Sequence, residues 1–514
     1  MNAFVDQLRC ELRVRGRRAA TPGVVLAVIA ISWLLLANPD SGSALMSVDD
    51  HRIRYSSGAL AFGSAGLGSL LLTLAGFYLV RGRMQEDSRC GIAGVLAATP
   101  ASNVSLVLAR WLGGTAYLLL LAAALLGSTV VLHLLRGEGP LQPGVYLQTY
   151  GLLLVPAMMF AAAAAQLADA WKPLMGRRGD VVYFILWVVL LVVFPMQGTS
   201  AHAQLKPWML LDVTGLVAGL AQLSRLLGSG NISIGDADFK AHLALVDFPP
   251  DFWTAGMLSL RLGSCFVVAV TLLLALLAFH RWAPEHVRTA SRSSGVAFRL
   301  ARMLEAVLGP ASRAVGRLLP LAGRLPALPA AVAAEFLVSL VTQPSALLWL
   351  AVAWFAPCLA PADALGKWQA GIALVWGLWA AELGARHAHD NTADLGASFT
   401  GGTVRRYTSR WCAAWLLGLM GSAGIVSMQP RAWLPLAAGY ALLAAVALLI
   451  GHATRSGRTF LALFMFWMLV TVQAHHASWF DFLGLNGAAM ILPDILAATL
   501  LLAIGIVAAR RLAR

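Results

Sequence analysis

Residues 111–132 read Trp-Leu-Gly-Gly-Thr-Ala-Tyr-Leu-Leu-Leu-Leu-Ala-Ala-Ala-Leu-Leu-Gly-Ser-Thr-Val-Val-Leu, a run without a charged side chain. A helix needs about 20 apolar residues to cross the roughly 30 Å hydrocarbon core of a bilayer, so this run predicts a membrane span. Similar runs recur along the whole chain. The sequence therefore predicts an all-α polytopic membrane protein.

The composition agrees with this class. Of 514 residues, 59% are hydrophobic and only 12% are charged, and the mean hydropathy is +0.74. Soluble proteins carry roughly a quarter charged residues, which excludes an ordinary cytosolic enzyme. The amount of apolar surface also excludes a disordered chain. The five cysteines show no CxxC and no paired spacing, so neither a disulfide framework nor a thiolate metal site is expected.

We expect about 12 transmembrane helices, six in each half of the chain. The first six are Thr21–Ala37, Gly58–Val80, Trp111–Leu132, Gly144–Ala168, Val181–Met196 and Met257–Phe279. The second six are Ser345–Leu359, Trp368–Ala381, Trp411–Met428, Leu434–Ile450, Thr459–Val472 and Gly487–Ala508.

The basic residues predict the orientation of these spans. If the N-terminus is cytoplasmic, 29 of the 38 Lys and Arg residues lie in cytoplasmic segments and nine on the other side. Cytoplasmic loops of membrane proteins are enriched in Lys and Arg, so both termini are expected to be cytoplasmic, in a multi-pass inner (plasma) membrane protein. The net charge of +14 is explained by these loops, and no nucleic-acid partner is expected.

The two halves of the chain also resemble each other. Glu11, then Thr21-Pro22 and an apolar run, open the first half, and Glu335, then Gln343-Pro344 and an apolar run, open the second. The charged cytoplasmic loop of each half ends in Arg-Trp, at Arg110-Trp111 and at Arg410-Trp411. Internal duplication is common in transporters.

We therefore expect three parts. Residues 1–280 form a first six-helix half with an N-terminal interfacial helix and a long outside loop at 197–251. Residues 281–329 form a basic, amphipathic cytoplasmic linker that suits an anionic membrane surface. Residues 330–514 form the second half.

The spans contain few groups that could couple transport to an ion gradient. Arg261, Asp494, Glu382 and Asp169 lie near span ends, whereas ion-coupled carriers usually place charges near the bilayer midplane. The chain also lacks GxxxxGK[ST], the phosphate-binding loop of many ATPases. We therefore expect a transporter subunit without catalytic residues, cofactor or metal of its own, driven by a separate protein.

The loop at 81–110 carries the most specific pattern. Glu86 and Asp87 precede a short apolar helix, which ends at a Thr-Pro-Ala-Ser break before Arg110. This loop resembles the coupling loop of ABC-2 type transporter permeases, whose pattern is an acid, Gly, Leu, Thr-Pro-x-Ser and a later basic residue. The matching residues are Asp87, Gly91, Leu96, Thr99, Pro100, Ser102 and Arg110, with Glu86 as a second acid.

The resemblance implies a partner. In that family the loop docks on a separate ABC ATPase subunit, which binds ATP and Mg, and a fused twelve-span chain would take two copies. It also implies export, here of a hydrophobic or amphipathic substrate. The loop of the second half, with Asp390 and Asp394, lacks Thr-Pro-x-Ser and matches less well.

Two other classes remain open from the sequence. One is an ion-coupled secondary transporter with duplicated halves. The other is a membrane enzyme that acts on lipid-linked substrates, for which a group of outer carboxylates would be the candidates: Asp212, Asp236, Asp238, Asp247 and Asp251.

Overall fold

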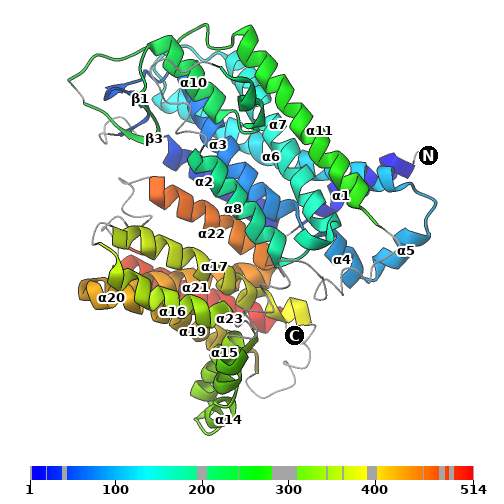
Figure 1. Cartoon of the computed structure of the whole chain (residues 1–514), viewed down its shortest axis with the longest axis vertical. Coiled ribbons are helices and arrows are strands. Elements are labelled where there is room, and N and C mark those ends of the chain that lie inside the picture. Colours follow the sequence, from blue (N-terminus) through cyan, green and yellow to red (C-terminus); the bar gives the residue numbers. More distant parts are fainter. Residues whose placement is uncertain are drawn as a thin grey trace. The chain divides into compact units, whose positions relative to one another are not determined.

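The computed structural model describes most of the chain and divides it into two compact units, Met1–Ser293 and Ser294–Arg514. The described residues are 3–18, 20–36, 43–193, 205–240, 242–280, 309–342, 345–361, 364–390, 402–454, 456–473, 481–485 and 491–512. Most of the predicted linker, Asp394 and parts of the 197–251 loop lie outside them. Helices dominate both units (Figure 1).

The first unit contains most of the ion pairs found between described residues. Its helices are α1 (Ala3–Gly16), α2 (Ala20–Leu35), α3 (Ser57–Val80), α4 (Arg83–Arg89), α5 (Ile92–Ala98), α6 (Asn103–Arg136), α7 (Pro143–Ala170), η2 (Lys172–Leu174), α8 (Arg177–Val193), η3 (Pro207–Leu211), α10 (Leu216–Leu227) and α11 (Ala255–Ala278). Its strands are β1 (Ser43–Val48), β2 (His51–Arg52) and β3 (Ile232–Asp238).

The second unit is helical throughout its described part. Its elements are α14 (Leu319–Ala322), α15 (Ala327–Thr342), α16 (Ser345–Leu359), α17 (Leu365–Asp390), α19 (Gly402–Gly421), α20 (Ala423–Met428), η6 (Pro430–Ala432), α21 (Trp433–Thr454), α22 (Gly457–Gln473) and α23 (Ile491–Leu512).

Six of the described helices are long and apolar enough to cross a membrane, or seven if α15 and α16 form one bent span. The six include α3, α6, α7 and α11 of the first unit and α21 and α23 of the second. The predicted helical membrane class is confirmed by these helices. Twelve spans remain a prediction, because α2, α8 and α22, with 16 or 17 residues each, are shorter than a perpendicular span requires.

In the first unit, α3 lies at the centre of the packing. Almost all of its residues are buried, and α6 and α7 pack along it. Glycines allow these close approaches, because a Cβ at Gly68 would overlap Leu125 of α6 and one at Gly114 of α6 would overlap Val80 of α3. Helices α7 and α11 run side by side at the edge of this group (Figure 1).

A small antiparallel sheet, ordered β2-β1-β3, was not predicted. Strand β1 pairs with β3 from Ser43 opposite Asp238 to Val48 opposite Ile232. The sheet thus joins the segment between α2 and α3 to the segment between α10 and α11. Beside it, Phe62 of α3 packs against Phe252, with ring centroids 4.8 Å apart, so these segments cover one end of the helices.

The second unit is built around α21. Helices α17, α19, α22 and α23 all pack on it. Two glycines bring α17 and α21 into backbone contact, because a Cβ on Gly384 would lie 2.5 Å from the Ala447 carbonyl oxygen and one on Gly451 would lie 2.6 Å from Gly384. Such small-residue contacts are typical of helix packing in membranes.

Candidate coupling site

The loop that resembles a coupling loop folds into two short helices, α4 and α5. Helix α4 starts where Asp169 of α7 accepts hydrogen bonds from the backbone nitrogens of Gly82 (2.7 Å) and Arg83 (3.0 Å). A carboxylate at a helix N-terminus satisfies free N–H groups and favours the helix dipole. The base of the loop is therefore fixed to α7.

Several motif residues shape the backbone of this loop. Gly91 has φ +72° and begins α5, a left-handed conformation that glycine adopts without strain. The Thr99 hydroxyl donates to the Leu96 carbonyl at 2.7 Å where α5 ends. Ser102 is the N-cap of α6 and accepts from the Ser105 nitrogen at 3.1 Å. Because Pro100 lacks an N–H, it suits the break between the two helices.

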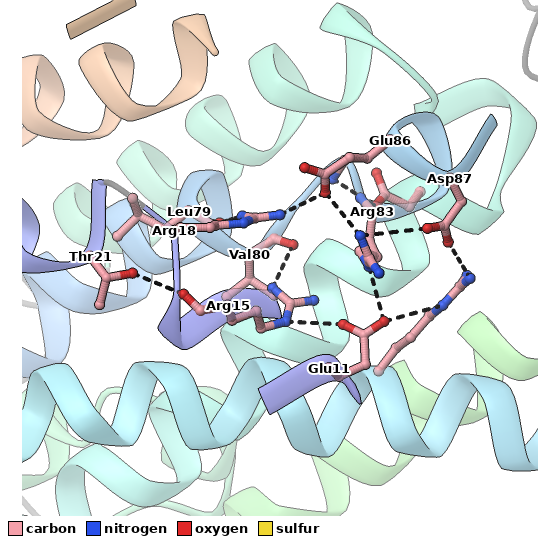
Figure 2. Close-up of polar contacts among 12 residues, drawn as sticks. Glu11, Arg15, Arg18, Thr21, Leu79, Val80, Arg83, Glu86 and Asp87 are labelled. Atoms are coloured by element: carbon pink, nitrogen blue, oxygen red, sulfur yellow. Dashed lines mark hydrogen bonds and ion pairs between the residues drawn. The ribbon is translucent and has the colours of Figure 1, made fainter. Parts of the chain in front are cut away.

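The two acids of the motif point into an ion network (Figure 2). Asp87 is buried and pairs with Arg110 at 2.5 Å and with Arg83 at 3.5 Å. Glu86 is more exposed and pairs with Arg18 at 2.7 Å and with Arg83 at 3.3 Å. The motif acid and the later basic residue of the sequence pattern are thus direct partners.

Helix α1 supplies the other half of the network. Glu11 pairs with Arg83 at 3.0 Å, with Arg15 at 3.4 Å and with Arg110 at 4.0 Å. Arg15 and Arg18 also donate to the Val80 and Leu79 carbonyl oxygens at the end of α3, as Figure 2 shows. These bonds satisfy carbonyls that a helix C-terminus leaves free.

Burial lowers the pKa of the Arg15 guanidinium, and the neighbouring Glu11 carboxylate opposes that effect. The charge of Arg15 therefore depends on Glu11 as its compensating partner, as expected for a buried ion pair. Helix α1 is held to α3 and α4 by charge rather than by apolar contact alone.

In contrast, α5 contains no buried residue. Ile92 is 45% exposed and Val95 is 67% exposed, whereas Leu96 packs partly against a cluster that includes Leu106 and Val107. Helix α5 is thus apolar and has an exposed face, and ion pairs fix the loop at its base. Such a face is suited to docking of a partner.

The remaining predicted site residues lie elsewhere. Asp390 is the last residue of α17 in the second unit, and Asp394 lies outside the described residues. Sequence reasoning did not connect Glu11, Arg83 or Asp169 with the shape of this loop, although all three hold it in place. The spacing of Glu11 and Arg15, four residues apart on one helix, was the available signal for an ion pair.

Of the outer carboxylates, Asp212 has a structural role. It accepts from the backbone nitrogens of Gly215 (3.1 Å) and Val217 (2.8 Å) at the start of α10. Asp247 instead forms an exposed ion pair with Arg54 at 3.2 Å. Within the described residues there is no group of three or more His, Cys, Asp or Glu side chains that could hold a metal ion.

Comparison with known proteins gives no assignment. No protein-family model, no curated protein and no solved structure matches the chain.

Proposed function

We propose that the chain is the membrane-spanning permease subunit of an ATP-driven transporter of the ABC-2 type. The observation that carries this proposal is the α4–α5 loop, in which an exposed apolar helix stands on a charged base linked to α1, α6 and α7. A separate ATPase that docks on α5 would move these helices together. The absence of GxxxxGK[ST] from the sequence supports a separate energy source.

The finer features of the proposal follow from the sequence. The chain would have two six-helix halves joined by a cytoplasmic linker, with both termini in the cytoplasm, and would reside in the inner membrane. Two ATPase copies would bind ATP and Mg, and the cargo would be hydrophobic or amphipathic and exported. The loop with Asp390 and Asp394 would be the second docking position.

Two groups of loop residues would have different tasks. Val95 and Ile92, outside the motif, would offer surface to a partner, whereas four motif residues would hold the shape of the loop: Asp87, Gly91, Thr99 and Ser102. Docking is therefore expected to be sensitive to the exposed face of α5. A mutation of Asp87 would act through the position of that face.

A mild-detergent pull-down of the tagged chain tests the proposal. We expect a Walker-motif ATPase to co-purify with the wild type and to be lost from Val95→Asp, because the charge would be placed in a desolvated contact. Leu211→Asp is the matched control, since Leu211 is 53% exposed but belongs to η3 in the loop region proposed to lie outside. Co-purification that is unchanged in Val95→Asp would refute α5 as the docking helix.

A chain that purifies without any ATPase would refute the proposed function as a whole. Transport that collapses with the proton gradient and survives ATP depletion would then identify an ion-coupled secondary transporter.

A further inference from the structure

One carboxylate near the start of each unit binds two arginines from two other segments. In the first unit, Glu11 of α1 pairs with Arg83 of α4 at 3.0 Å and with Arg110 of α6 at 4.0 Å. In the second unit, Glu335 of α15 pairs with Arg386 of α17 at 2.8 Å and with Arg410 of α19 at 3.1 Å. All six side chains are largely shielded from solvent.

The residue after the second arginine repeats as well. The Trp111 indole donates to the Met159 carbonyl oxygen of α7 at 3.0 Å. The Trp411 indole donates to the Ala441 carbonyl oxygen of α21, also at 3.0 Å. Each Arg-Trp pair thus links one helix to a carboxylate on one side and to a neighbouring helix on the other. The corresponding helices of the two units also pack alike: α1 packs on α6 in the first unit, and α15 packs on α19 in the second.

The two arginines of each triad stand at the two ends of one loop. Arg83 and Arg110 flank the segment that contains α5, and Arg386 and Arg410 flank residues 391–401, which the sequence predicts as a loop. A single carboxylate therefore ties both ends of a loop to α1 or α15. We name these groups the first clamp (Glu11, Arg83, Arg110) and the second clamp (Glu335, Arg386, Arg410).

We infer that the two clamps are equivalent parts of a duplicated unit, and that Glu11 and Glu335 are positioning residues that transmit loop movement to α1 and α15. The inference rests on the proposed function, because it assigns to Glu335 the coupling of a second ATPase contact. When a partner moves a loop, the clamp makes both loop ends and the helix move as one body. Without the carboxylate, the two arginines lose the group that draws them together.

The clamps differ in one respect that the experiment can use. In the first clamp, Asp87 also pairs with Arg83 and Arg110, so a carboxylate remains when Glu11 is neutralised. In the second clamp, Glu335 attracts Arg410 and accepts its hydrogen bond at 3.1 Å, while Arg386 and Arg406 repel it. Neutralising Glu11 should therefore leave the first clamp partly paired through Asp87.

The test uses the complex of the full chain with its co-purified ATPase in lipid nanodiscs, and the readout is the stimulation of ATP hydrolysis over the free ATPase. We expect Glu335→Gln to keep the ATPase bound but to lose about fivefold or more of the stimulation, within the usual range of coupling between sites. Glu11→Gln should lose part of the stimulation, because Asp87 still pairs with Arg83 and Arg110, and Glu335→Asp should recover part of the loss caused by Glu335→Gln. Glu138→Gln is the control, since Glu138 pairs with Arg52 at 2.6 Å in the outer loops and should show normal stimulation.

A second variant separates coupling from folding. Replacing Glu335, Arg386 and Arg410 together by methionine removes the three charges of the clamp at once, a change that folded proteins often tolerate. This variant should assemble with the ATPase and still show reduced stimulation. Normal stimulation in it, or in Glu335→Gln, would overturn the inference.

If no ATPase binds the wild type, the proposed function is refuted. Hydrogen exchange then tests the inference without an ATPase. In that case Glu335→Gln should still raise exchange in α15 and in the first turns of α19, but not in α21. Unchanged exchange in α15 would show that Glu335 does not hold it, and would overturn the clamp itself.

Discussion

Arg81→Met is expected to destabilise the first unit more than any exposed substitution. The Arg81 side chain is fully buried and forms ion pairs with Asp169 and Asp180. It also donates to the carbonyl oxygens of Leu174 (2.6 Å) and Gly176 (2.8 Å). Methionine has similar length but no charge and no donor, so all four partners lose their contact with the guanidinium.

The size of the effect follows from these contacts. Removing one partner of a buried ion pair costs about 3–5 kcal/mol, and each buried carbonyl that loses its donor adds about 1 kcal/mol. Asp169 keeps the backbone nitrogens of Gly82 and Arg83, which offsets part of the loss. We therefore expect about 4 kcal/mol, and a fall in apparent melting temperature on the order of 10 °C.

The assay is thermal unfolding of the purified chain in detergent, monitored by fluorescence-detected size-exclusion chromatography. Arg9→Met is the control, because Arg9 is exposed and its contact with Asp6 is 3.9 Å, which makes a change within about 0.5 kcal/mol the expectation. Arg81→Met with Asp180→Asn should recover part of the loss, because a carboxylate that paired with Arg81 is neutralised as well. A melting temperature of Arg81→Met close to that of wild type, or no recovery in the double variant, would refute this reasoning.

Three further outcomes are expected. Gly91→Ala should strain the left-handed turn before α5 by about 1–2 kcal/mol and weaken ATPase co-purification. Gly91→Asn should be less severe, because asparagine tolerates positive φ. Equal behaviour of the two variants would contradict this account. Gly451→Ala should destabilise the second unit by about 1–3 kcal/mol, since its new Cβ would overlap the Gly384 backbone, as thermal unfolding can measure. The Asp50 pKa is lowered by its hydrogen bond and ion pair with Lys240, so carbon-13 NMR should find this carboxyl titrating below its ordinary value, and Lys240→Gln should raise the midpoint. Because the folded pKa is the lower one, this contact contributes above the unfolded pKa of Asp50 and is lost as the pH falls through the folded pKa.

The local structure of the loop was accessible from sequence because it depends on neighbouring residues. Gly, Thr-Pro and Ser each have a local preference that predicts a turn, a helix end and an N-cap. Gly91, Thr99 and Ser102 occupy those positions. No tertiary contact is needed to place the break between α5 and α6.

The ion network was not accessible in this way. Glu11 and Arg83 are 72 residues apart, and nothing in either segment specifies the other as a partner. The interfacial helix expected at the N-terminus also does not predict the orientation of α1, in which Leu12 is exposed while Glu11 and Arg15 are buried. In a chain with apolar surroundings, the polar side of a surface helix can turn towards the protein when ion partners are present.

The spans were predicted less well for a related reason. Helix α3 is apolar on all sides, so its sequence carries no periodicity that identifies its neighbours. Pairing of β1 with β3 joins segments nearly 200 residues apart, and short strands beside long apolar helices leave little signal. Composition thus predicted that helices cross a membrane, but it could not distinguish a full span from a shorter helix such as α8 or α22.

The charge count of the network explains why its role is positional. The basic members are Arg15, Arg18, Arg81, Arg83 and Arg110, and the acidic members are Glu11, Glu86, Asp87, Asp169 and Asp180. Five charges of each sign cancel, so the network exerts little long-range field. Buried ion pairs are often no more stable than apolar residues of the same volume, because desolvation offsets their attraction. An apolar contact can slide, however, whereas each of these pairs has a fixed partner and direction. These pairs hold α1, α4, α6 and α7 in one arrangement while α5 keeps its exposed face, and under the proposed function a force on α5 would reach all four helices.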